Sequence, residues 1–574
     1  MVWLALLLAQ SLGGGLPEIL GRLTAAMEKP FHIQWTSHSL PCLLICTAIY
    51  LAALCTYHTN HGRTREGAEH GSASWGTPRE VNRLFCQREN KILTRNVRLG
   101  LDSHRHRRNL NVLVIGGSGA AKTRGYVLPN ILEANTNYVV TDPKMEVLTA
   151  TGGYLESQGY EIRVLNLVNL AQSDGYNPFR YLRDEKDALK LVNNLIQATT
   201  PKGSHESDPF WQKAETALLQ AVILMLWQEA PEYEQNFSMV LRVLEYAEVK
   251  EKDEDYISPL DLLFQAMERE DRNSVAARQY RVFKMAAGKT SKSILVSAAV
   301  RLAPFNLPQL KAITDHDEMD LYTLGERKCA LYAVIPDNDQ SFNFLVSLLY
   351  AQAFQALYYS ADQIHHGALP CHVHFVLDEF AAMPLPGFTR ELATMRSRNI
   401  SASTIIQNIA QIKELYRDSW ETIPGNSDTI LFLGGNEAGT HKFISEALGK
   451  STIQTKTHGQ TKGRSGSWST NFQISGRELL TPDEVRQLDN RYAILFIRGA
   501  KPVMDLKYDL TRHPAIRHTV DGGGAPYVHH HKRAGLPGDA LFLPEAGKLT
   551  FERKDAEYEE KHPESDRASA QTGV

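Results

Sequence analysis

One segment of this sequence combines the residue types that hold phosphate groups. Gly116-Gly-Ser-Gly-Ala-Ala-Lys-Thr123 directly follows the apolar run Asn111–Ile115. The order G-x-x-x-x-G-K-[ST] between a strand and a helix is typical of a P-loop. Its glycines let backbone N–H groups close around phosphates, and the N-terminus of the following helix adds a favourable dipole. The segment therefore predicts a site for ATP.

Each position of this segment has an expected part in binding. Lys122 would neutralise the phosphates during catalysis, and Thr123 would be a ligand of Mg²⁺. Ala121 stands where the pattern has its last glycine, so its methyl group would crowd either the approaching phosphates or the required dihedral. The predicted nucleotide-binding residues are Gly116, Gly117, Ser118, Gly119, Ala120, Ala121, Lys122 and Thr123.

Two adjacent carboxylates follow a second apolar run. In His372-Val-His-Phe-Val-Leu-Asp-Glu-Phe380 the run ends in Asp378 and Glu379. Together with a P-loop, such a pair supplies the other half of an ATPase site. Asp378 would hold Mg²⁺ through water, and Glu379 would polarise the attacking water.

Three polar residues near the next apolar run are further candidates. Gln407 is the last residue of the run SASTIIQ. It could sense the γ-phosphate, or it could be a plain polar residue at the end of a strand. Arg396 and Arg398 precede that run. Surface arginine is the ordinary interpretation, but in a ring one of them could reach a neighbour's nucleotide as an arginine finger, with Arg396 favoured.

The pattern between residues 79 and 515 alternates β-rich runs with helical stretches. This alternation predicts an α/β fold with a parallel sheet and crossover helices. The expected strands are Asn111–Ile115, Tyr138–Thr141, Cys329–Ile335, His372–Leu377, Ala402–Ile406, Thr429–Leu433 and Ala493–Ile497.

Three segments depart from that alternation. Residues 181–310 show helical periodicity and few strand signals, so an all-α insertion is expected. Residues 451–476 are rich in Ser, Thr, Gly, Gln and Lys and predict a mobile loop. The stretch from about 516 to 574 predicts a disordered tail.

The N-terminal part of the chain predicts a membrane anchor. Leu40–Tyr57 carries no charge and approaches the roughly 20 residues that a spanning helix needs. A buried core helix is the alternative for this run. Val2–Leu12 is shorter and is interpreted as the first helix of a membrane hairpin.

Composition limits the kinds of partner. The 574 residues have a net charge of −3, so any nucleic acid would have to meet a local channel and not a basic face. The six cysteines contain no CxxC pair, which is typical of free thiols in a reducing compartment.

Together these motifs resemble the type IV secretion coupling proteins of the TraG/TraD conjugal transfer family, in the branch found in Gram-positive conjugative elements. The resemblance covers the chain from the membrane segment to about Arg512. Besides the P-loop, its markers are Gly71-Ser-Ala-Ser-Trp-Gly-Thr77, Thr141-Asp-Pro-Lys144, Tyr176-Asn-Pro-Phe179, Leu377-Asp-Glu-Phe380 and Arg396-Ser-Arg-Asn-Ile-Ser401.

The resemblance implies a RecA-like P-loop ATPase motor with an inserted all-α domain that meets cargo. It implies domains at 1–65 (membrane anchor), 66–180 and 311–515 (the two parts of the motor), 181–310 (all-α) and 516–574 (tail).

It also implies a homohexamer at the cell membrane with its motor in the cytoplasm. The implied cofactors are ATP and Mg²⁺, and the implied partners are a relaxase, single-stranded DNA and the subunits of a type IV secretion channel. Two alternatives stay open: a docking receptor whose P-loop has decayed at Ala121, and a pump for double-stranded DNA.

Overall fold

The computed structural model describes residues 2–13, 15–61, 68–200, 209–247, 256–286, 288–383, 385–460 and 468–530. The chain divides into two compact units. The smaller unit combines residues 1–73 with Leu448–Leu479, and the larger combines Ser74–Ala447 with the chain from Leu480 onwards.

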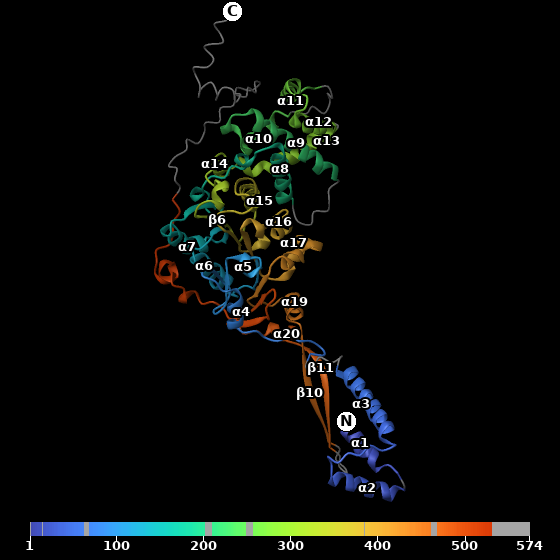
Figure 1. Ribbon diagram of the computed structural model, residues 1–574. Helices are drawn as coiled ribbons and strands as arrows, with labels where there is room; N and C mark the ends of the chain where they lie inside the picture. Colours follow the sequence, from blue (N-terminus) through green and yellow to red (C-terminus); the bar gives the residue numbers. More distant parts are fainter. Residues whose placement is uncertain are drawn as a thin grey trace, which may run out of the picture. The chain divides into compact units, whose positions relative to one another are not determined.

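A nine-stranded sheet organises the larger unit, in the order β13-β12-β9-β3-β8-β7-β4-β6-β5. Figure 1 labels β6 of this sheet among the surrounding helices. The strands from β9 to β5 are parallel, whereas β12 runs antiparallel to β9 and to β13. Their bounds are β3 Val112–Ile115, β4 Asn137–Pro143, β5 Glu161–Asn166, β6 Cys329–Ile335, β7 Val373–Leu377, β8 Ile400–Ile406, β9 Thr429–Phe432, β12 Tyr492–Ile497 and β13 Val503–Leu506.

All seven strands expected from the sequence are in this sheet, which confirms the predicted α/β class. The parallel strands are buried on both faces, as strands covered by crossover helices must be. Strands β5 and β13 were not predicted from the sequence. A short pair, β1 (Asn90–Ile92) and β2 (Arg98–Gly100), was also missed.

Helices cover the sheet along the crossover connections. The longest, α15 (Asn343–Tyr359), is buried almost all round because it lies between the sheet and the inserted helices. The others of the motor are α4 Pro78–Phe85, α5 Ser103–His106, α6 Leu128–Leu132, α7 Glu146–Ser157, α16 Phe388–Thr394, α17 Ile409–Tyr416, α18 Thr422–Gly425, α19 Ala438–Leu448 and α20 Pro482–Arg486.

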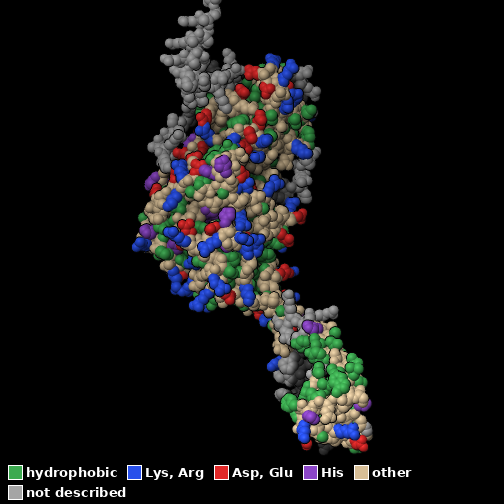
Figure 2. Space-filling model, viewed as in Figure 1, with side chains coloured by type: hydrophobic (Ala, Val, Ile, Leu, Met, Phe, Trp, Pro, Cys, Tyr) green, Lys and Arg blue, Asp and Glu red, His purple; other side chains and the backbone are tan. Residues whose placement is uncertain are grey.

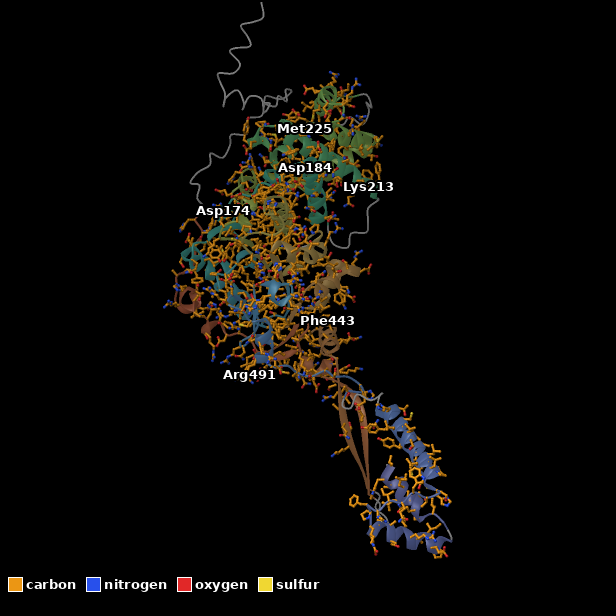
Figure 3. All side chains as sticks on the ribbon, viewed as in Figure 1. Asp174, Asp184, Lys213, Met225, Phe443 and Arg491 are labelled. Carbon is orange, nitrogen blue, oxygen red and sulfur yellow. The ribbon has the colours of Figure 1, made fainter. Side chains whose placement is uncertain are left out.

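The expected all-α insertion is present. Its helices are α8 Glu185–Thr199, α9 Pro209–Glu229, α10 Phe237–Glu245, α11 Pro259–Glu270, α12 Val275–Lys284, α13 Gly288–Leu302 and α14 Pro308–Thr314, and no strand occurs among its described residues. We call these helices the helical lobe. The side chain of Asp184 caps the start of α8, and Met225 of α9 is buried inside the lobe (Figure 3).

The prediction of a mobile loop at 451–476 is wrong for the described part of that segment. Strands β10 (Lys450–Gln460) and β11 (Trp468–Glu478) form an antiparallel ribbon in the smaller unit, and residues 461–467 lie outside the described residues. Threonines and serines gave the segment a loop-like polarity. Threonine, however, is β-branched and therefore favours strands.

The predicted disorder is also wrong for residues 516–530. Here the chain packs on α7: a Cβ built on Gly152 would lie 2.5 Å from the Tyr527 ring. His529 Nε2 lies 2.9 Å from Asp174 Oδ1, and both residues are buried (Figure 3 labels Asp174). A burial partner far away in sequence orders this glycine-rich stretch. The remainder of the expected tail, 531–574, lies outside the described residues.

The smaller unit begins with α1 (Val2–Ser11), α2 (Leu16–Glu28) and α3 (Ser39–His61). Ser39–Thr59 of α3 is long and apolar enough to cross a membrane, and only 6% of its apolar window is buried. Figure 2 shows the hydrophobic side chains gathered over this helix. The ten residues of α1 span about 15 Å, half of a hydrocarbon core. Among the described residues, α3 alone has the length of a spanning helix.

Candidate nucleotide-binding site

The P-loop lies at the carboxyl edge of the parallel strands. Gly116 follows β3, and its backbone N–H donates to the carbonyl of Ile406 at 3.0 Å. Gly117 donates to the carbonyl of Gly434 at 2.9 Å, and a Cβ built on Gly117 would lie 3.3 Å from the α-carbon of Gly435. Close backbone approach therefore explains the glycine at position 117.

Ala121 adopts the left-handed conformation that the motif reserves for glycine, with φ at +67°. Gly119 has a similar φ of +73°. The departure noted in the sequence thus acts on the dihedral, because an L-residue with a Cβ is strained there.

The two candidate side chains that follow the loop contact other residues of the predicted site. Lys122 Nζ donates to the carbonyl of Gly117 at 3.2 Å, so the ammonium group lies over the loop. Thr123 Oγ1 donates to Asp378 Oδ2 at 3.0 Å. This bond joins residues 255 positions apart in the sequence and unites the two predicted halves of the site.

Asp378 is buried, and this burial raises the pKa of its carboxyl group. The hydrogen bonds from Thr123 and from the Glu379 backbone, and the charge of Lys122, act in the opposite direction. Glu379 has a φ of +48°, which turns the chain sharply after β7. Both carboxylates line a hollow of about 240 Å³ that the P-loop closes on one side.

The donor set fits magnesium. Thr123 offers a hydroxyl group and Asp378 a carboxylate, and Mg²⁺ prefers such oxygen ligands with phosphates and waters completing its shell. No cluster of three or more His, Cys, Asp or Glu side chains in the described chain offers a site made of protein ligands alone.

The loop after β4 supplies residues that were not predicted as part of the site. Lys144 and Met145 have φ of +71° and +64°, and Lys144 Nζ pairs with Asp337 Oδ2 at 3.1 Å. Lys144 also lines the hollow. Asp142 is buried and accepts N–H groups at the start of α7, and burial raises the pKa of its carboxyl group to about 7. The Thr141–Lys144 marker was the available signal.

A second lysine supports the P-loop from a distant segment. Lys507, just beyond β13, donates through Nζ to the carbonyl of Ala120 at 3.0 Å and to Asn490 Oδ1 at 2.6 Å. Burial lowers the pKa of Lys507 to about 8. No local motif in the sequence indicated this contact.

Gln407 and the two arginines lie at opposite ends of β8. Gln407 follows the strand at the P-loop edge, next to Gly116. Its backbone N–H donates to Oε1 of Gln411 in the following helix, α17. Arg396 and Arg398 precede the strand in a short turn. The seven residues of β8 span about 23 Å, so the arginines lie away from this chain's own P-loop.

The two arginines also differ in their partners. Arg398 forms two bonds with Asp362 at 2.9 and 2.8 Å and lies over the ring of Tyr358. Arg396 is exposed and donates only to the backbone carbonyl of Ser103 among the described residues.

A parallel sheet with a P-loop after one strand and an acidic pair after another defines a RecA-like P-loop fold. A family model for type IV secretory system conjugative DNA transfer matches residues 74–508, more than half of the chain. The protein belongs to this family, whose members include the coupling proteins that the sequence resembles.

Curated relatives agree with that assignment. The chain is 25% identical to protein VirD4 of Rhizobium radiobacter over 409 residues, which is 68% of this chain and 55% of VirD4. It is 22% identical to conjugal transfer protein TraG of the same organism over 403 residues, 68% of this chain and 60% of TraG. The chain thus spans little more than half the length of these relatives.

Solved structures share the fold. The bacterial conjugative coupling protein TrwBΔN70 superposes with a TM-score of 0.56 at 15% identity, over 76% of this chain and 94% of that chain. TrwB in complex with ADP and Mg²⁺ gives 0.55 at 14% identity, with the same coverage. The assignment to a Gram-positive branch stays a prediction.

Proposed function

We propose that this protein is a coupling ATPase that recruits a relaxase bound to single-stranded DNA and delivers it to a type IV secretion channel. The observation that carries the proposal is the 3.0 Å bond between Thr123 and Asp378, because it brings the two expected magnesium ligands together beside the P-loop. Family membership supports the transfer role, and the structure of TrwB in complex with ADP and Mg²⁺ supports the proposed cofactors.

The described side chains divide the chemistry among them. Lys122 would leave the Gly117 carbonyl to meet the phosphates, and Thr123 and Asp378 would hold Mg²⁺, which supplies charge neutralisation. Glu379 lies in the same hollow and would orient the attacking water and accept its proton. Gln407 follows β8 beside Gly116 and would sense the γ-phosphate.

The proposed assembly is a homohexamer anchored in the cell membrane by α3, with the motor in the cytoplasm. The motor must face the cytoplasm because ATP is available there, and this requirement sets the orientation of α3 in the membrane. The exposed Arg396 is the better candidate for a finger reaching a neighbour's nucleotide, since Arg398 is already held by Asp362 and Tyr358.

Turnover of ATP by the purified full chain tests the proposal. We expect hydrolysis that requires Mg²⁺, rises with single-stranded DNA and is lost in Lys122→Ala. Lys442→Ala is the control, because Lys442 is an exposed lysine of α19 that pairs with Glu446 and does not line the hollow. Binding of cargo without any hydrolysis would refute the motor.

One observation favours a second candidate, a docking receptor without turnover. The φ of +67° at Ala121 places a strained alanine in the loop that must close around phosphates. If that strain abolishes nucleotide binding, the protein would tether cargo to the channel, and another ATPase would supply the energy for transfer.

A further inference from the structure

A hollow of about 660 Å³ lies between α11 and α12 of the helical lobe (Figure 1 labels both helices). Four of its six lining residues are arginines, so we call it the arginine hollow. The lining consists of Gln265, Glu268, Arg269, Arg272, Arg278 and Arg281. All four arginines are exposed, and the neighbouring Glu270 and Asp271 are not among the lining residues. None of the nucleotide-site residues lines this hollow, so it is a separate feature of the lobe.

The packing of α11 against α12 brings these arginines together. The rings of Phe264 and Tyr280 stack with their centroids 4.1 Å apart, and Tyr280 Oη donates to Asp261 Oδ1 at 2.9 Å. Lys284 also pairs with Asp261, at 3.0 Å, so the end of α12 lies beside the start of α11 and the two helices are antiparallel. Residues three or four positions apart share a face of a helix, and the arginines of both helices therefore line one hollow.

The positive charge of the arginine hollow is only partly neutralised. Glu268 pairs with Arg281, while Arg278 donates to a side-chain amide oxygen at 2.7 Å and keeps its full charge. The guanidinium groups of Arg269 and Arg272 form no ion pair or hydrogen bond within the described part of the chain. Guanidinium forks bind the paired oxygens of carboxylates and phosphates. The hollow therefore fits a chain that carries several anionic groups.

The lining favours carboxylates over a strand of DNA. Proteins that hold single strands stack the bases on aromatic rings placed among their basic residues. None of the described lining residues of the arginine hollow is aromatic. An acidic peptide needs only the guanidinium groups, which the hollow supplies.

The chain itself carries an acidic segment beyond its last described residue, His530. Asp555-Ala-Glu-Tyr-Glu-Glu-Lys-His-Pro-Glu-Ser-Asp566 has six carboxylates and one lysine, a net charge of −5 over 12 residues. The 24 residues at 531–554 connect it to His530 and could span roughly 80 Å when extended. A compact unit the size of the larger one is roughly 60 Å across. The acidic segment therefore has the length to reach the hollow, at an effective concentration on the order of millimolar because it is tethered.

We infer that the arginine hollow binds the acidic segment Asp555–Asp566 of this chain's own tail, with its carboxylates paired to Arg269 and Arg272. The inference does not depend on the proposed function, because it needs only the hollow and the tail. A docked tail would cover this side of the helical lobe. Any partner that uses the same arginines would first have to displace it.

The reaction of each arginine with phenylglyoxal, followed by mass spectrometry, tests the docking in the full chain in detergent. The comparison protein is a neutral-tail variant, which combines Glu557→Gln, Glu559→Gln and Glu560→Gln. At low salt, Arg269 and Arg272 should react about fivefold or more slowly in wild type than in this variant, at any protein concentration.

Arg390 is the internal control for this reaction. It is exposed on α16 and lies outside the arginine hollow, so it should react at the same rate in both proteins. Equal rates for Arg269 and for Arg272 in wild type and the neutral-tail variant overturn the inference.

A synthetic peptide of residues 552–567 is the second probe. It should bind the neutral-tail variant, and it should bind wild type about fivefold or more weakly because the tethered tail holds the site. Within the neutral-tail variant, Arg269→Ala with Arg272→Ala should weaken peptide binding about fivefold or more. Lys186→Ala with Lys289→Ala removes two exposed lysines of the lobe outside the hollow and should leave binding unchanged. Equal losses in both pairs would show that net charge, and not the hollow, binds the peptide, and would overturn the site.

A twenty-residue oligothymidylate decides between the tail and nucleic acid. If the peptide does not bind the neutral-tail variant, while the oligothymidylate binds it and needs Arg269 and Arg272, the hollow belongs to nucleic acid and the tail inference is wrong. Peptide binding by a protein that does not hydrolyse ATP would sink the proposed motor and leave this site intact.

Discussion

Replacing Ala121 by glycine should strengthen nucleotide binding. Ala121 has φ of +67°, where an alanine is about 1–2 kcal/mol less stable than in its preferred regions and a glycine is not. An empty loop can escape the strain by moving, but a loop closed around phosphates cannot. The strain then opposes binding in full, and 1–2 kcal/mol corresponds to a roughly 5- to 30-fold gain in affinity for Ala121→Gly.

Gly119 provides the matched control. Its φ of +73° is nearly the same, and a Cβ added there would meet nothing within 4 Å. Gly119→Ala therefore adds the dihedral strain without a clash and should weaken binding by a similar factor. Calorimetric titration of ATP into wild type, Ala121→Gly and Gly119→Ala measures both effects. Equal affinities for wild type and Ala121→Gly would refute the strain argument and remove the support for the docking receptor.

Four further results are expected. Glu379→Gln should keep ATP binding, measured with a fluorescent analogue, and slow hydrolysis by about two to four powers of ten, while equal loss of both would make Glu379 structural. The Lys507 ammonium is charged below its pKa of about 8, so ATP affinity should fall about fivefold from pH 7 to pH 9, and Lys507→Arg should remove that fall. Arg396→Ala should reduce ATP turnover only in assembled protein, and its activity should be restored in mixtures with Lys122→Ala subunits; no restoration would place Arg396 outside the site. Deleting residues 1–65 should give a protein that no longer sediments with membranes after a high-salt wash.

The sequence predicted those parts of the fold and of the site that depend on short, continuous segments of the chain. The P-loop and the Asp378–Glu379 pair each follow an apolar strand, and parallel strands bring their carboxyl ends to one edge of the sheet. Strand β5 was missed because Arg163 interrupts its apolar pattern. In the structure that guanidinium is 2% exposed and donates to Met319 O and Thr323 Oγ1.

Contacts between distant segments were beyond the reach of local patterns. The hydrogen bond from Lys507 to Ala120 joins residues 387 positions apart, and neither residue carries a signal for the other. The same holds for the order of residues 516–530, which depends on packing against α7. Polarity gave the wrong result for β10 and β11, where backbone pairing and not burial makes the strands.

The last described residues contact α7, so the folded part of the motor extends beyond the segment that matches the family model. The family match stops at residue 508, yet Tyr527 fills the space over Gly152 and His529 pairs with the buried Asp174. A fragment trimmed to the family region would leave a groove beside Gly152 and a carboxylate without its partner. A fragment of the motor should therefore extend at least to His529, some twenty residues beyond the end of the family match.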